Sequence, residues 1–183
     1  KKLFEKRLDD LFTVELPDDI PGAHDIQGRI GGYWHGNEPC HHIAYLYNYL
    51  GKPWKCQKWI REIVARFYGN EPGSLSGNDD CGQMSAWYVL AAAGIHPICP
   101  GDGRYEITSP VFDRVEFRLD PAYAAGGSFV IEARDNSPEN IYIQSATLNG
   151  KKYDKCYLTH DDLATGGTLV LQMGAKPSDW GKD

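Results

Sequence analysis

The sequence lacks a long hydrophobic run, an excess of basic residues and a closely spaced pair of cysteines. No apolar stretch reaches the ~20 residues that a membrane-spanning helix needs. Its 25 Asp and Glu outnumber its 19 Lys and Arg, giving a formal net charge of -6, so a basic surface for nucleic acid is not predicted. None of the five cysteines forms a Cys-x-x-Cys pair, which disfavours a structural zinc site.

The first residues, "KKLFEKRLDDLF", are charged throughout and do not have the pattern of a signal peptide. They have helical spacing from the start and no initial Met. We therefore expect the chain to be part of a longer polypeptide. Its 42% of hydrophobic residues is enough for a packed core.

The pattern of apolar residues changes near Pro100, which predicts an α+β fold. Before Pro100 the spacing is helical, and after it short alternating runs are separated by turn residues. The expected helices span residues 1–12, 39–49, 54–68 and 82–93. The expected strands lie in "RYEITSP", "RVEFRL", "SFVIEARD", "NIYIQSATLNGKKY" and "TLVLQM", and we expect them to pair in an antiparallel sheet or sandwich. Asn149-Gly150 predicts a type I′ hairpin.

A Pro- and Gly-rich segment, Glu15 to Pro39, separates the first two expected helices. It is much longer than a usual connection, and loops of this length are commonly functional or lid-like.

Two similar polar motifs precede expected helices: "GNEPCHH" begins at Gly36 and "GNDDCG" at Gly77. One interpretation of Asn78, Asp79 and Asp80 is helix capping, because Asn and Asp accept hydrogen bonds from the free amides of a first turn. A single residue would suffice for that role. Three polar residues in a row between glycines are more than a cap needs, which leaves a second interpretation open beside capping, a binding or catalytic site.

In the first motif, the adjacent His41 and His42 point about 100° apart on a helix, so they are poorly placed to share a metal ion. A zinc site is therefore disfavoured, and a hydrogen-bonding role is favoured. The oxygen atoms of Asn37 and Glu38 would suit a hard cation such as calcium.

Two antiparallel helices could bring both motifs to the same end of a helical bundle. The result would be a pocket lined by carboxylates and rimmed by Tyr33, Trp34 and Trp54. Acids combined with aromatic rings are typical of sugar-binding sites, and two acids facing across a sugar can hydrolyse a glycosidic bond.

Both motifs, in the stretches "GNEPCHHIAYLYNYLGKPWKCQ" and "GNDDCGQMSAWYVLAAAGIHPICPG", resemble the glycoside hydrolase family 92 α-mannosidases. The resemblance extends from about Leu11 into the final strands. It implies a calcium-dependent, inverting exo-α-mannosidase that acts on mannose-containing oligosaccharides outside the cytoplasm, in the periplasm or after secretion. It also implies an N-terminal β-sandwich followed by an (α/α)6 barrel, with the active site between them.

The resemblance also assigns roles to individual residues. Asp80 matches the general base, with Asp79 and Asn78 supporting it. Glu38 matches the calcium and sugar end of the site. A third group is expected near the sugar: Asn37, His41, His42 and Trp34.

The resemblance places the general acid upstream of "GNEP", in a segment that is not recognisable here. It therefore implies that residues 1–100 are the last helices of the barrel and that residues 101–183 form a β region. We expect such a fragment to be inactive alone and to self-associate through exposed apolar surface. Two alternatives stay open: a non-catalytic carbohydrate-binding or accessory module, and a purely structural helical domain with a β appendage.

Overall fold

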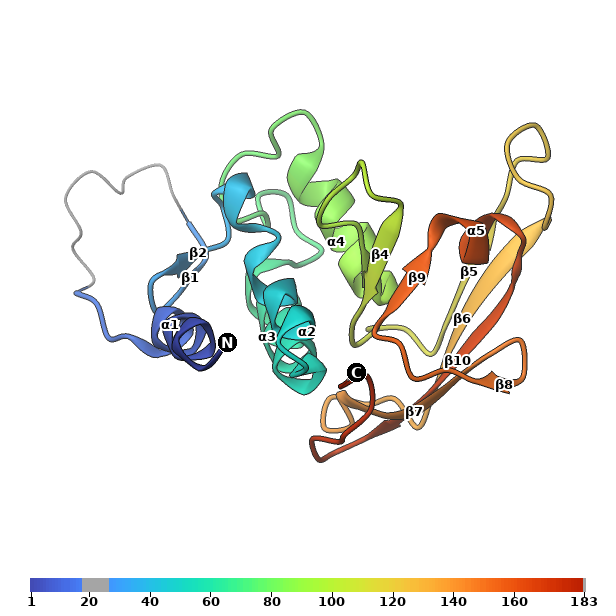
Figure 1. The fold of residues 1–183 in the computed structure, drawn as a ribbon. Helices are drawn as coiled ribbons and strands as arrows, with labels where there is room; N and C mark the ends of the chain where they lie inside the picture. Colours follow the sequence, from blue (N-terminus) through green and yellow to red (C-terminus); the bar gives the residue numbers. More distant parts are fainter. Residues whose placement is uncertain (18–26, 183) are drawn as a thin grey trace.

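The structure is a computed structural model that describes residues 1–17 and 27–182. Helices occupy the first half of the chain and strands most of the second half, side by side (Figure 1). The expected α+β class is thereby confirmed. In the part of the chain that is described, no helix is long and apolar enough to cross a membrane.

Three of the expected helices form within two residues of their predicted ends: α1 (Lys2–Thr13), α3 (Pro53–Phe67) and α4 (Gln83–Ala93). Pro53 is tolerated at the start of α3 because its missing amide would have no helical partner there. The Phe12 ring of α1 stacks on Trp59 of α3 with centroids 4.6 Å apart. Gly94 ends α4 with a left-handed backbone conformation.

The predicted helix over residues 39–49 is wrong as a continuous α-helix. The structure has two 3₁₀ turns and one short helix instead: η1 (Glu38–Cys40), η2 (Ile43–Tyr45) and α2 (Leu46–Tyr49). The amides of Cys40, His41 and Tyr45 bond to carbonyls three residues back. An apolar spacing of three or four residues over one turn fits both helix types, so it could not distinguish them.

The strands form a five-stranded and a three-stranded sheet, besides a small hairpin near the N-terminus. The five-stranded sheet has the order β5 (Arg114–Arg118), β6 (Ser128–Arg134), β10 (Gly167–Gly174), β7 (Tyr142–Leu148), β8 (Lys151–Lys152). The three-stranded sheet has the order β3 (Ile95–His96), β4 (Arg104–Ile107), β9 (Tyr157–Thr159). The expectation of a purely antiparallel region is wrong at one place, because β10 runs parallel to β6.

The predicted Asn149-Gly150 hairpin is confirmed. It joins β7 to β8, and both turn residues have positive φ, 51° and 76°, as a type I′ turn requires. A short helix that was not predicted, α5 (His160–Ala164), follows β9 and begins with a reciprocal capping box between Thr159 and Asp162.

The long segment before the first motif contains a small hairpin of β1 (Arg29–Ile30) and β2 (Tyr33–Trp34). Residues 18–26 of that segment lie outside the described residues. Its lid-like role stays a prediction.

Buried polar contacts join the helical and β halves, each of which has its own hydrophobic cluster. Gln57 Oε1 of α3 accepts the Ile143 amide of β7 at 3.0 Å. Asn48 of α2 donates to Glu106 of β4 at 2.8 Å, and the Glu106 side chain is fully buried. The proposed division at residue 100 remains a prediction.

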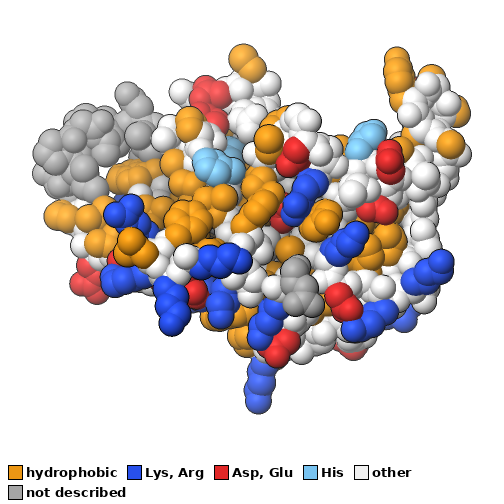
Figure 2. Space-filling model, viewed as in Figure 1, with side chains coloured by type: hydrophobic (Ala, Val, Ile, Leu, Met, Phe, Trp, Pro, Cys, Tyr) orange, Lys and Arg blue, Asp and Glu red, His pale blue; other side chains and the backbone are white. Residues whose placement is uncertain are grey.

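Figure 2 shows hydrophobic side chains gathered over the helical half of the visible face. The large apolar side chains that are at least two-fifths exposed lie on both halves: Leu3, Phe4, Val14, Tyr49, Val89, Phe112 and Tyr123. This exposure is what the self-association prediction requires, and the association itself stays a prediction.

Candidate active site

The two motifs meet, as predicted, at one end of the helical half. Glu38 begins η1, Asp80 lies in the turn before α4, and their carboxyl groups are close enough to interact. The interaction with the Asp80 carboxyl group is the main reason that the pKa of Glu38 is raised above its ordinary value. The Glu38 Oε1 atom is buried and has no hydrogen-bond partner among the described residues.

An unusual turn presents the Asp80 side chain. Asp80, Cys81 and Gly82 have positive φ values of 44°, 60° and 94° in succession. Left-handed conformations at two consecutive non-glycine residues are uncommon and tend to occur at functional sites. The turn leaves Asp80 exposed and beside Glu38 instead of folding it onto the helix.

Asp79 is engaged by the helix. Its Oδ1 accepts the Ser85 amide at 2.8 Å, and its carbonyl accepts the Gly82 and Met84 amides. The capping interpretation therefore applies to Asp79, whose carboxylate satisfies an otherwise free amide of the first turn of α4. Any catalytic role of Asp79 stays a prediction.

A buried chain of hydrogen bonds, which was not predicted from the sequence, lies beneath both motifs. The Tyr33 hydroxyl lies 2.9 Å from His35 Nδ1, and His35 Nε2 lies 2.6 Å from the Tyr68 hydroxyl. Tyr68 in turn donates to the Met84 carbonyl of α4 at 3.2 Å. Every group is satisfied if His35 is neutral and carries its proton on Nε2. Burial, followed by the proximity of His41, lowers the pKa of His35 to about 3, which agrees with a neutral ring.

His41 and His42 have different environments, as the angle between adjacent helical residues predicted. His41 is buried. Its Nε2 donates to the His35 carbonyl at 3.0 Å, and the Trp87 indole N–H donates to the His41 carbonyl at 3.4 Å. Burial lowers the pKa of His41. These hydrogen bonds tie η1 to α4, and the contact of His41 with sugar stays a prediction. His42 is exposed, and its contact with sugar stays a prediction.

The predicted aromatic rim is partly wrong. Tyr33 is 1% exposed, so it belongs to the core. Trp54 is the second residue of α3, whereas Tyr68, which lies beneath the motifs, follows the end of that helix. A helix of this length separates the two residues by ~20 Å, so Trp54 lies far from the motifs. Trp34 is half-buried, with the Arg29 guanidinium 5.6 Å from its ring centroid, and it can still face a ligand.

The two asparagines also occupy different places. Asn37 directs its Nδ2 to Cys40 Sγ at 3.7 Å, and Asn78 is exposed. Their contacts with sugar stay predictions, since neither position is tested by the geometry.

The described residues provide only part of a metal site. Within residues 1–17 and 27–182 no group of three His, Cys, Asp or Glu is arranged to hold a metal ion. The unpartnered Glu38 Oε1, with the Asp80 carboxyl nearby, does fit one edge of an oxygen-rich calcium site.

Comparison with known proteins agrees with this geometry. Residues 1–175 match the model of the glycosyl hydrolase family 92 catalytic domain. The GH92 α-mannosidase BT3965 from Bacteroides thetaiotaomicron, solved with mannoimidazole, is 58% identical, with a TM-score of 0.92 over 99% of this chain and 23% of that one. The inverting GH92 mannosidase BT2199 from the same organism is 36% identical, with a TM-score of 0.81 over 99% of this chain and 25% of that one.

A protein of Arthroderma benhamiae described as an uncharacterized secreted glycosidase is 35% identical over 146 residues, which are 80% of this chain and 19% of that protein. The chain thus spans about a fifth to a quarter of the length of these relatives. The (α/α)6 barrel is not visible in so short a segment and remains an expectation. The matched family model, the solved mannosidases and the paired carboxyl groups agree that the chain belongs to glycosyl hydrolase family 92.

Proposed function

We propose that this chain is part of an inverting exo-α-mannosidase that removes terminal α-linked mannose from glycans in the periplasm or outside the cell. The observation that carries the proposal is the contact between Glu38 and Asp80, which the fold brings together from two separate motifs. BT3965 and BT2199 are mannosidases, and this relationship supports the proposed substrate class.

In this proposal Asp80 is the general base. Its exposed carboxylate takes a proton from the water that attacks the anomeric carbon on the face opposite the leaving group. The turn with three positive φ values keeps the carboxylate directed away from the helix amides, whose needs Asp79 already satisfies.

Glu38 is poorly placed to be the general acid for Asp80. The two carboxyl groups of inverting glycosidases lie about 6.5–9.5 Å apart, because the sugar and a water molecule fit between them. The carboxyl groups of Glu38 and Asp80 are close enough to interact directly, which leaves no such space. We therefore place the general acid in another part of the full-length polypeptide and propose that residues 1–183 alone are inactive.

Glu38 is instead proposed as a calcium ligand, through its unpartnered Oε1. Calcium takes six to eight oxygen ligands. Further oxygen atoms would have to come from Asp80, backbone carbonyls, water, the sugar or the rest of the polypeptide. When bound, the ion would hold sugar hydroxyls and favour a distorted ring.

The first test is mannose release from an α-1,2-mannobiose by this chain, with calcium and with EDTA. We expect no release in either condition. Calcium-dependent release would show that the acid lies within these residues and would contradict the argument that excludes Glu38 from that role.

The second test uses a chimera in which this chain replaces the matching segment of BT3965. We expect Asp80→Asn to lower kcat by about 10²–10⁴-fold, the usual contribution of general base catalysis, without changing Tm. Asp161→Asn, a neutralised acid in the first turn of α5, is the matched control and should retain activity. Near-normal hydrolysis by the Asp80→Asn chimera would favour the accessory carbohydrate-binding module instead.

A further inference from the structure

The two motifs meet at a second point, one turn beyond the carboxyl pair. The His41 amide donates to the Glu38 carbonyl at 3.0 Å, so His41 lies one turn after Glu38. In the second motif the Gln83 amide donates to the Asp80 carbonyl at 3.3 Å, so Gln83 lies one turn after Asp80. The side chains of His41 and Gln83 are in contact, with Gln83 Nε2 3.4 Å from His41 Nδ1. This contact therefore lies beside the carboxyl pair.

The proton of the His41 ring has a defined place. His41 Nε2 lies 3.0 Å from the His35 carbonyl oxygen, and a carbonyl oxygen only accepts, so Nε2 carries the proton. Burial lowers the pKa of His41 and thereby favours the neutral ring. In a neutral imidazole with its proton on Nε2, Nδ1 is an acceptor. Gln83 must therefore present the NH2 group of its amide to His41, and not the oxygen.

The amide oxygen of Gln83 is consequently directed away from His41, because the two ends of a planar amide point in different directions. Gln83 is exposed, and its Oε1 makes no hydrogen bond with any residue in the ranges 1–17 and 27–182. Asp80, one turn before it, is exposed as well. The structure thus holds an unused acceptor, with a fixed orientation, next to the carboxylate that is the candidate base.

We propose that Gln83 binds the substrate in this site, its Oε1 accepting a hydrogen bond from a hydroxyl group of the sugar, and that His41 is the positioning residue that fixes its orientation. Sugar hydroxyl groups are hydrogen-bond donors, and an acceptor that is already oriented loses little conformational entropy when a ligand binds. The inference rests on the proposed function, because it takes a mannoside as the ligand.

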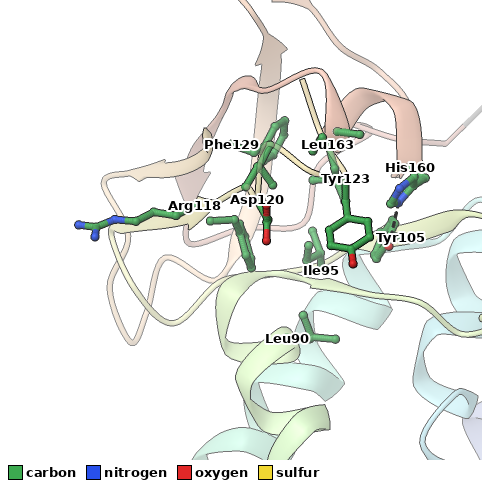
Figure 3. A pocket seen from close by; sticks show the side chains of 13 residues that line it. Leu90, Ile95, Tyr105, Arg118, Asp120, Tyr123, Phe129, His160 and Leu163 are labelled. Atoms are coloured by element: carbon green, nitrogen blue, oxygen red, sulfur yellow. Dashed lines mark hydrogen bonds between the residues drawn. The ribbon is translucent and has the colours of Figure 1, made fainter. Parts of the chain in front are cut away.

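The groove in the β half (Figure 3) offers little to the hydroxyl groups of a sugar. Its volume is about 320 Å³, and most of its lining is aliphatic or aromatic: Leu90, Ile95, Phe117, Phe129 and Leu163. Polar groups of the groove are already engaged, since the Tyr105 hydroxyl lies 3.3 Å from His160 Nδ1 and the Asp120 carboxylate is bonded within its own turn. Hydroxyl groups placed there would lose water without gaining acceptors. The sugar is therefore assigned to the end of the protein where the motifs meet.

The first test examines the orientation of the amide in the isolated chain. Long-range ¹⁵N–¹H spectra of the imidazole rings near neutral pH should show His41 as the neutral tautomer with its proton on Nε2. Gln83→Met removes the donor to Nδ1 and should shift the ¹⁵N resonance of that atom. A proton on Nδ1 would require Gln83 to present its oxygen to His41, and this result would overturn the proposal.

The second test measures the binding of mannoimidazole by calorimetry, in the full-length polypeptide and in the BT3965 chimera. Gln83→Met keeps the length of the side chain but removes both amide groups, and it should weaken binding by about two- to tenfold, the usual contribution of one neutral hydrogen bond. Gln144→Met is the matched control. Gln144 is an exposed glutamine of β7 whose Nε2 donates to the carbonyls of Tyr142 and Lys176, and its replacement should leave binding unchanged.

A double-mutant cycle tests the positioning role of His41. If His41→Phe acts through Gln83, it should weaken mannoimidazole binding in the unsubstituted protein but have no further effect in the Gln83→Met background. Additive effects would refute the positioning role, because a general loss of stability would weaken binding in both backgrounds.

The outcomes separate this inference from the proposed function. If the unsubstituted protein neither binds mannoimidazole nor releases mannose, the proposed function fails and the role of Gln83 fails with it. If the unsubstituted protein binds mannoimidazole and Gln83→Met binds it equally well, only the role of Gln83 is refuted. An amide oxygen is also a calcium ligand, so calcium affinity is measured in parallel. A loss of calcium affinity as large as the loss of mannoimidazole affinity would assign Oε1 to the ion and overturn its assignment to the sugar.

Discussion

Replacing Tyr68 by Phe should test whether the buried chain beneath the motifs stabilises the protein. The substitution removes one hydroxyl that accepts from His35 Nε2 at 2.6 Å and donates to the Met84 carbonyl at 3.2 Å. The Met84 carbonyl belongs to α4 and keeps a helical partner, but the fully buried His35 would keep a donor without an acceptor. A lost hydrogen bond with an unsatisfied buried donor costs about 1–3 kcal/mol of unfolding free energy.

Urea unfolding followed by tryptophan fluorescence measures this loss. Tyr88→Phe is the matched control, because the Tyr88 ring stacks on Tyr68 at 4.8 Å while its hydroxyl makes no hydrogen bond among the described residues. The control should change the unfolding free energy by less than about 0.5 kcal/mol. If the two substitutions cost the same, the hydrogen-bonded chain does not hold α4 and the His35 assignment is wrong.

Two further predictions concern pH and backbone packing. Burial lowers the pKa of His35 to about 3 and the pKa of His96 to about 4. As the pH drops from 6.5 towards 4, these two histidines are therefore protonated in the unfolded chain but stay neutral in the folded chain. The unfolding free energy should fall over this range, and each unit of pKa difference between the folded and unfolded states corresponds to ~1.4 kcal/mol. Urea midpoints that stay constant over that range would contradict it. Gly36→Ala should destabilise strongly because its Cβ would lie 2.2 Å from the Ser76 carbonyl oxygen, whereas Gly101→Ala meets nothing within 4 Å and should leave the Tm within about 1 °C. Equal Tm values for the two variants would show that the motif backbones can separate.

Local patterns predicted most helices and one turn of this fold. The apolar faces and terminal residues of α3 and α4 placed both within one or two residues, and Asn149-Gly150 identified its hairpin. The parallel pairing of β6 with β10 could not be read in the same way, because three other strands lie between them in the sequence and the pairing depends on the whole sheet. Helix α5 is only one turn long, too short for a periodic signal.

The residues of the candidate site could be predicted where they lie within one short sequence motif. The motifs identified Glu38 and Asp80, and their meeting followed from two loops at one end of antiparallel helices. The supporting His35 and Tyr68 were missed because the contact between them and the contact of Tyr68 with Met84 join segments 33 and 16 residues apart. "GYWHGNEP" does contain His35 beside the motif, but a histidine among aromatic residues gives no indication of which atoms it will contact.

The glycine of the first motif explains why the carboxyl groups meet. Gly36 packs its backbone directly against the Ser76 carbonyl, one residue before the second motif, and also against the Gln27 carbonyl. Any side chain at position 36 would push the two backbones apart. Since Glu38 and Asp80 lie only two and four residues beyond this contact, backbone packing fixes their separation before any side-chain bond forms. A glycine in this position is therefore a requirement of the carboxyl pair, and not only a turn residue that precedes a helix.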